Sequence, residues 1–139
     1  MATNLQFSIA VHLLAALGHR KGRQTTSAML AHSVNTSPSF VRRTLAKLSK
    51  AGLVSTATGS AGSCWLGREA KKISLLDVYQ AVRAPRAFAI HAYHECKPCP
   101  VSCHIKSSLE KALGRAQHSL EASLDKITLA DIVADIRQP

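Results

Sequence analysis

HSVNTSPSFVRRTLAKLSKAGLVS, residues 32–55, predicts two helices joined by a tight turn. Asn35 tolerates the left-handed backbone conformation that such a turn requires. Ser37 and Pro38 have the features of an N-cap and a first helical residue, because proline is preorganised for the first turn of a helix. Gly52 is expected to end the second helix. The segment therefore predicts a helix-turn-helix.

The second helix of this pair is amphipathic. Val41, Leu45 and Leu48 fall on one face and are expected to be buried. The residues left toward solvent or a ligand are polar or basic: Ser39, Arg42, Arg43, Lys47 and Lys50. The helix thus combines a buried apolar face with a positively charged outer face.

The flanking sequence continues a small, mostly helical fold. Residues 5–17 predict a first helix, which we expect Gly18 to end as a left-handed cap. Thr26 or Ser27 can cap the short helix that precedes the turn.

Downstream, residues 53–56 and 63–66 favour two short strands around a glycine-containing tip, which is where a wing would lie. Cys64 and Trp65 in the second strand are expected to be buried. Residues 74–82 predict a further short helix.

The C-terminal part predicts a long helix. Apolar residues recur after Pro100 at three- and four-residue steps: Ile105, Leu109, Ala112, Leu113, Ala116, Leu120, Leu124 and Ile127. A domain this small cannot cover so long an apolar stripe, so we expect a homodimer seam. A smaller helix over residues 129–136, capped by Thr128, could close this seam.

These elements predict a mainly α fold: a winged helix-turn-helix with a small β-hairpin wing and a long C-terminal dimerisation helix. We expect a DNA-binding domain over residues 1–83, a Cys/His-containing sensor loop over residues 84–100, and the dimerisation and C-terminal helices over residues 101–139. A chain of 139 residues is large enough for one hydrophobic core.

Charge is concentrated in the first domain. Residues 1–83 contain eleven Lys and Arg against two acids, whereas residues 84–139 contain seven against six. The electrostatic field of this excess positive charge attracts polyanions, and double-stranded DNA is the favoured partner. A membrane is not expected, because no apolar run approaches ~18 residues. The N-terminus has no features of a secretory signal, so we expect a cytoplasmic protein.

The predicted geometry assigns DNA contacts to the helix-turn-helix, because the major groove admits one helix whose N-terminal residues reach base edges. Candidates for base contact are Ser37, Ser39 and Arg43, with Arg42 instead of Arg43 if the helix is rotated. Candidates for phosphate or wing contact are Thr26, Ser27, Lys47, Thr58 and Ser60. The alternative is a non-specific nucleic-acid-binding or protein-interaction module. No catalytic motif is present, and we expect no enzyme.

A Cys/His-rich segment follows the basic domain. The thiolates of Cys96, Cys99 and Cys103, with His104 or a ligand from the other subunit, suit zinc or an iron-sulfur cluster, since thiolates and imidazoles bind both. Alternatively, Cys99 is a redox-sensing N-cap of the long helix, where the helix dipole favours a thiolate, and Cys96 or Cys103 resolves its oxidation product. A purely structural role is the third interpretation. Spacing alone does not choose among them.

The sequence resembles a family of bacterial repressors that includes the iron-sulfur cluster regulator IscR, the nitric-oxide sensor NsrR and the cysteine-metabolism regulator CymR, and within it the YwnA-like branch. The similarity lies in five segments that span nearly the whole chain: residues 7–12, 33–54, 73–78, 99–101 and 124–132. The resemblance implies a homodimer that reads an inverted repeat, usually as a repressor, and an effector sensed near the cysteines. Where the family's wing often carries an arginine, this chain has Thr58.

Overall fold

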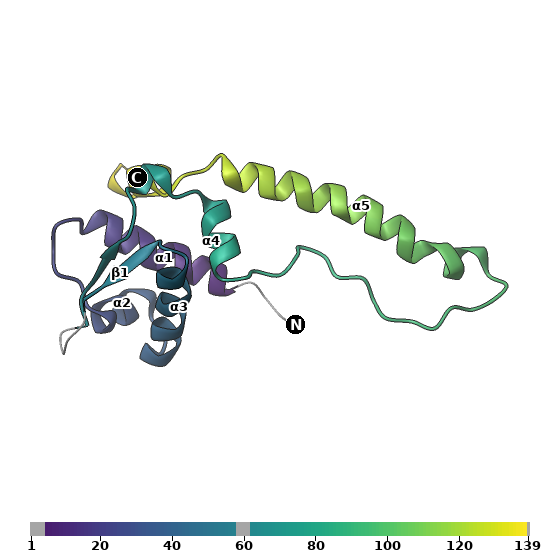
Figure 1. The fold of residues 1–139 in the computed structure, drawn as a ribbon, viewed down its shortest axis with the longest axis horizontal. Coiled ribbons are helices and arrows are strands. Elements are labelled where there is room, and N and C mark those ends of the chain that lie inside the picture. Colours follow the sequence, from purple (N-terminus) through teal and green to yellow (C-terminus); the bar gives the residue numbers. More distant parts are fainter. Residues whose placement is uncertain (1–4, 58–61, 139) are drawn as a thin grey trace. The chain divides into compact units, whose positions relative to one another are not determined.

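The computed structural model describes residues 5–57 and 62–138, which form two compact units (Figure 1). The first unit runs to Ala84 and resumes at Leu124, and the second comprises Pro85–Ser123. The C-terminal helix, expected to close the dimerisation segment, therefore packs with the basic N-terminal domain. The mainly helical winged helix-turn-helix fold is confirmed.

The helix-turn-helix lies in the first unit. It consists of α2 (Ser27–Val34) and α3 (Pro38–Lys50), and α1 (Leu5–His19) packs against both. The Thr26 hydroxyl caps α2 by accepting a hydrogen bond from the Met29 N–H, and Ser37 caps α3 in the same way from the Phe40 N–H, both at 3.2 Å. Asn35 between the helices has φ of 59°, in the left-handed region. The predicted caps and turn are confirmed.

Gly18 is not the left-handed cap that the sequence predicted. It is buried within α1, which continues to His19. A Cβ atom at Gly18 would lie 3.0 Å from Cγ2 of Val133, a residue near the other end of the chain. The glycine therefore permits a close approach between α1 and the C-terminal helix.

The wing is a two-stranded antiparallel hairpin of β1 (Val54–Thr56) and β2 (Cys64–Leu66), with Ser55 opposite Trp65. Cys64 is buried as expected, but Trp65 is 49% exposed, so its predicted place in the core is wrong. Neighbouring side chains of a strand point to opposite faces, and the buried face is taken by Cys64. The tip residues 58–61, which include the proposed contacts Thr58 and Ser60, lie outside the described residues.

Three further elements complete the first unit: the 3-10 turn η1 (Ala70–Lys72), α4 (Leu75–Ala81) and α6 (Leu129–Arg137). Ser74 and Thr128 each begin a helix with a reciprocal capping box. The two caps also meet, since Leu75 N–H donates to Ile127 O and Leu129 N–H donates to Ile73 O, both at 2.8 Å. These bonds fasten α6 to the segment before α4.

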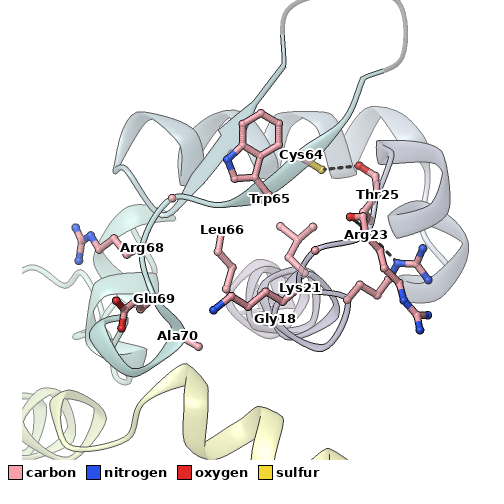
Figure 2. Close-up of a pocket in the computed structure, with 14 residues that line it drawn as sticks. Gly18, Lys21, Arg23, Thr25, Cys64, Trp65, Leu66, Arg68, Glu69 and Ala70 are labelled. Atoms are coloured by element: carbon pink, nitrogen blue, oxygen red, sulfur yellow. Dashed lines mark hydrogen bonds between the residues drawn. The ribbon is translucent and has the colours of Figure 1, made fainter.

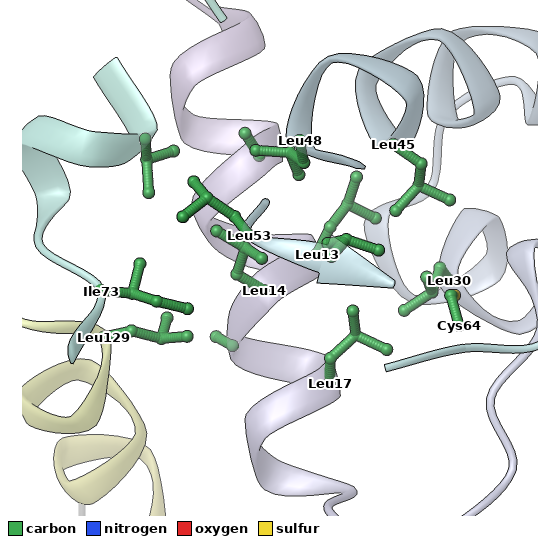
Figure 3. Packing of buried hydrophobic residues seen from close by; sticks show 14 of the residues in the cluster. Leu13, Leu14, Leu17, Leu30, Leu45, Leu48, Leu53, Cys64, Ile73 and Leu129 are labelled. Carbon is green, nitrogen blue, oxygen red and sulfur yellow. The ribbon is translucent and has the colours of Figure 1, made fainter. Parts of the chain in front are cut away.

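The core of the first unit is built around α1 (Figure 3). Leu13, Leu14 and Leu17 follow one another along this helix and pack against leucines of α2, α3 and the segment after α3. Ile73 and Leu129, both fully buried, close the side near α6. Burial of a leucine contributes roughly 1.5–3 kcal/mol, so this cluster holds α3 firmly on the domain.

The second unit consists mainly of the long helix α5 (Pro100–Asp125) and the segment that leads into it. Gln117, the only residue of α5 that is buried, accepts a hydrogen bond from the Ala87 N–H at 2.9 Å. The apolar stripe of α5 is only partly covered. Val101 at the start of α5 is 67% exposed, and Phe88 in the preceding segment is 65% exposed. None of the described helices combines the length and apolar character needed to cross a bilayer.

Candidate nucleic-acid interface and cysteine segment

The outer face of α3 carries most of the predicted DNA contacts. Ser37, Ser39, Arg42, Arg43 and Lys47 are all exposed. The Arg42 guanidinium donates to the Ser39 hydroxyl at 3.4 Å, while the guanidinium of Arg43 lies 5.5 Å from the centre of the Phe40 ring. The two arginine side chains thus contact different neighbours within the same helix.

A groove of about 580 Å³ separates α3 from the hairpin. Arg42 and Lys50 line it from α3, Ser27 from the start of α2, and Thr56 from β1. It therefore brings two cations together with the first residue of α2, where free N–H groups favour an anion. Arg43 is not among the residues that line this groove.

Lys47 is held by a contact that the sequence did not indicate. Its ammonium donates to the side-chain oxygen of Gln6 at 3.0 Å, and the Gln6 amide donates to the Thr44 hydroxyl at 3.3 Å. Thr44, fully buried, donates in turn to Phe40 O at 2.9 Å. Gln6 therefore joins α1 to the middle of α3, and no local pattern links residues so far apart in the chain.

The interface is strongly positive because it contains no acids. The first acidic residue of the chain is Glu69. The described residues contain two salt bridges, Arg68 with Asp77 and Lys71 with Glu69, and neither involves α2 or α3. The charges of Arg42, Arg43, Lys47 and Lys50 are therefore not neutralised by carboxylates, as expected of a surface that binds phosphates.

In the second unit, Cys96 and Cys99 lie at the two ends of a four-residue turn. The Cys99 N–H donates to Cys96 O at 2.8 Å, which closes the turn around the cis peptide between Lys97 and Pro98. Pro100 begins α5, and the Cys99 Sγ accepts a hydrogen bond from the Ser102 N–H at 3.5 Å. The predicted position of Cys99 at the start of the long helix is confirmed.

Ser102 fastens this turn to α5. Its hydroxyl accepts from the Cys96 N–H at 2.7 Å, and its carbonyl accepts from the Tyr93 hydroxyl at 2.6 Å. Cys96 is exposed, while Cys99 and Cys103 are half-buried. The cysteines are thus free, accessible and attached to the first turn of α5.

The metal interpretation requires at least three ligands in one place. In the described part of the chain, no group of three or more His, Cys, Asp or Glu side chains is arranged to hold a metal ion. Cys96, Cys99, Cys103 and His104 therefore do not form a ligand set within a single chain.

Cys64 has a different environment from these three cysteines. Its thiol is enclosed in the core and donates to Thr25 O at 3.5 Å. Burial raises its pKa, because the charged thiolate is poorly solvated there. A neutral, buried thiol is unreactive, in agreement with the packing role that we expected.

Known proteins share this architecture. YwnA of Bacillus subtilis strain 168, a protein assigned to the HTH-type transcriptional regulators, is 33% identical over 131 residues, which are 94% of this chain and 96% of that protein. A structure from Lactobacillus plantarum assigned as a transcriptional regulator has 25% identity and a TM-score of 0.82, covering 98% of this chain and 92% of its own. CymR, the global cysteine regulator of Bacillus subtilis, matches in fold at 20% identity, with a TM-score of 0.70 over 96% of this chain and 97% of its own.

The family assignment rests on nearly the full length of the chain. The family model of Rrf2, described as an iron-dependent transcriptional regulator, matches residues 3–135. The resemblance noted in the sequence is thereby confirmed, and the protein is a regulator and not an enzyme. The chain belongs to the Rrf2 family of DNA-binding transcriptional regulators.

Proposed function

We propose that this chain is a cytoplasmic repressor that binds an inverted-repeat operator as a homodimer, with one α3 helix in each of two successive major grooves. The observation that carries the proposal is the exposed basic face of α3, capped at Ser37 and free of acidic neighbours. A helix that enters the major groove reads base edges with its N-terminal residues.

The contacts divide into two sets. Ser37, Ser39 and Arg43 lie on the first turns of α3 and are proposed to read base edges, since arginine recognises guanine with two hydrogen bonds. Arg42 and Ser27, which line the groove beside the hairpin, are proposed to bind a phosphate, together with Thr26 and Lys47. Thr58 and Ser60 remain candidates for a contact from the wing.

The dimer is proposed to form along α5. Within one chain, Leu109, Leu113, Leu120 and Leu124 remain only half-buried. A two-fold seam would cover this stripe and present two α3 helices with the symmetry of an inverted repeat.

Selection of bound duplexes from a randomised pool tests this proposal. The expected product is one inverted-repeat sequence with half-sites separated by about 10 bp, or a multiple of it. Recovery of unrelated duplexes with equal affinity would contradict it and favour the non-specific nucleic-acid-binding module.

We also propose that oxidation of Cys99 controls DNA binding. A peroxide is the oxidant: the Cys99 thiolate attacks one peroxide oxygen, which gives a sulfenic acid and releases the other oxygen as water after protonation. The Cys96 thiol then attacks the Cys99 sulfur, a disulfide forms, and the sulfenic oxygen leaves as a second water. Two thiols are oxidised by two electrons while one peroxide is reduced.

The turn between the two cysteines supports this pairing. A four-residue turn brings its end Cα atoms within about 7 Å. Disulfides span roughly 4.4–6.8 Å between Cα atoms. Because Ser102 binds both Cys96 and Cys99 through hydrogen bonds, the change is expected to reach the first turn of α5 and hence the spacing of the two reading helices.

Peroxide treatment followed by mass spectrometry and an operator-binding assay tests the switch. We expect a Cys96–Cys99 disulfide and reduced operator affinity in the native chain and in Cys103→Ser, and no response in Cys99→Ser. An unchanged response of Cys99→Ser would remove Cys99 from the mechanism. A cluster absorbance band or stoichiometric metal after anaerobic purification would instead support the metal interpretation.

A further inference from the structure

The first unit contains a second cavity, far in sequence from the cysteine segment. Its volume is about 610 Å³, within the range typical of small-molecule sites. The end of α1, the turn before α2, strand β2 and residues 67–70 line it, with Leu17, Leu66 and Ala70 as apolar walls. Figure 2 shows Trp65 and Leu66 along the β2 side, with Gly18 and Lys21 across from them.

Two of the four cations that line the cavity are already engaged. Arg20 donates to the Thr25 hydroxyl at 3.2 Å and to Gln24 O at 3.4 Å. Arg68 pairs with Asp77 at 3.4 Å. These two arginines stabilise the surrounding fold.

The other two cations are available for a ligand. Lys21 and Arg23 lie on the turn that follows α1, are exposed, and make no side-chain hydrogen bond or ion pair with the described residues. Glu69, the one acid of the lining, is paired with Lys71 at 3.4 Å. The mouth of the cavity therefore has an excess of positive charge that a carboxylate would neutralise.

Trp65 indicates the shape of the ligand. It is the only tryptophan of the chain, 49% exposed at the edge of this cavity. An indole beside an apolar wall offers a flat surface for stacking an aromatic ring. We propose that this cavity binds a small aromatic monocarboxylate, with its ring against Trp65 and Leu66 and its carboxylate on Lys21, while Arg23 adds a second positive charge at the mouth.

Because Trp65 is the only tryptophan of the chain, its indole N–H signal reports ligand binding at the cavity. In ¹H–¹⁵N spectra of the full chain, Trp65 gives one indole N–H peak, which is followed during titration with salicylate. We expect this peak and the backbone amides of residues 20–25 to shift and saturate below about 10 mM. Salicylamide, which lacks the charge, and hexanoate, which lacks the ring, are each expected to bind at least about tenfold more weakly.

Two matched double variants test whether salicylate binding needs the positive charge at the cavity. Lys21→Gln with Arg23→Gln is expected to weaken salicylate binding by about tenfold or more. Lys72→Gln with Lys126→Gln removes the same charge outside the cavity and is expected to leave the affinity within about twofold. Equal losses in the two double variants, or an unmoved Trp65 peak with salicylate, would overturn the proposal. DNA is absent from this experiment, so its result is independent of operator recognition.

Discussion

At the scale of single residues, Arg43 and Lys47 are predicted to contribute differently to DNA binding. Arg43→Ala should reduce the preference for the operator over random duplex by about 1–3 kcal/mol, because a base contact is lost. Lys47→Ala should weaken both duplexes alike and lower the salt dependence by about one phosphate contact. Fluorescence anisotropy with both duplexes at several salt concentrations measures this. Equal losses on both duplexes for Arg43→Ala would exclude a base-reading role.

Cys64 provides a second prediction at this scale. Because burial raises the pKa of its thiol above the unfolded value, the folded chain holds the proton more tightly. The associated stability is complete below the ordinary thiol pKa of about 8.5 and falls as the pH rises toward the higher folded-state value. In urea unfolding from pH 7 to 10, Cys64→Ala should therefore lose less stability with increasing pH than the native chain. Parallel pH profiles would show that the Cys64 thiol does not contribute.

At the scale of elements, the sequence predicts correctly the features that depend on neighbouring residues. The cap at Ser37, the left-handed Asn35 and the apolar spacing of α3 each depend on neighbouring residues, and all are confirmed. Two features depend instead on distant contacts: Gly18 packs near Val133, and Lys47 binds Gln6. Strand alternation separates Cys64 from Trp65, but the core that packs against the hairpin decides which of the two is buried. No periodicity contains such information.

Helix α6 has a cap that the sequence predicted correctly, but it packs against the N-terminal domain, which the sequence did not predict. Thr128→Ala removes the hydroxyl that accepts the Asp131 N–H at 3.2 Å and should lower the free energy of unfolding by about 1 kcal/mol. Chemical denaturation of the full chain measures this change. Thr128→Ser keeps the hydroxyl and should retain most of the stability, so an equal loss in both variants would contradict the capping role.

At the scale of the whole molecule, the partly covered stripe of α5 predicts a dimer. Leu120→Lys places a charge in the proposed seam and should shift the protein to monomers, because a buried unpaired charge costs several kcal/mol. Ser119→Lys, at an exposed neighbouring position, should remain dimeric. Sedimentation velocity distinguishes the two species. A dimeric Leu120→Lys variant would place the seam elsewhere.

In the proposed complex, two subunits present two α3 helices to one duplex. The most direct test is the mass of the complex with the selected operator, measured by sedimentation equilibrium, beside a duplex that carries only one half-site. We predict two chains on each operator and much weaker binding to the half-site. One chain per operator, or equal affinity for the two duplexes, would contradict this mode of recognition.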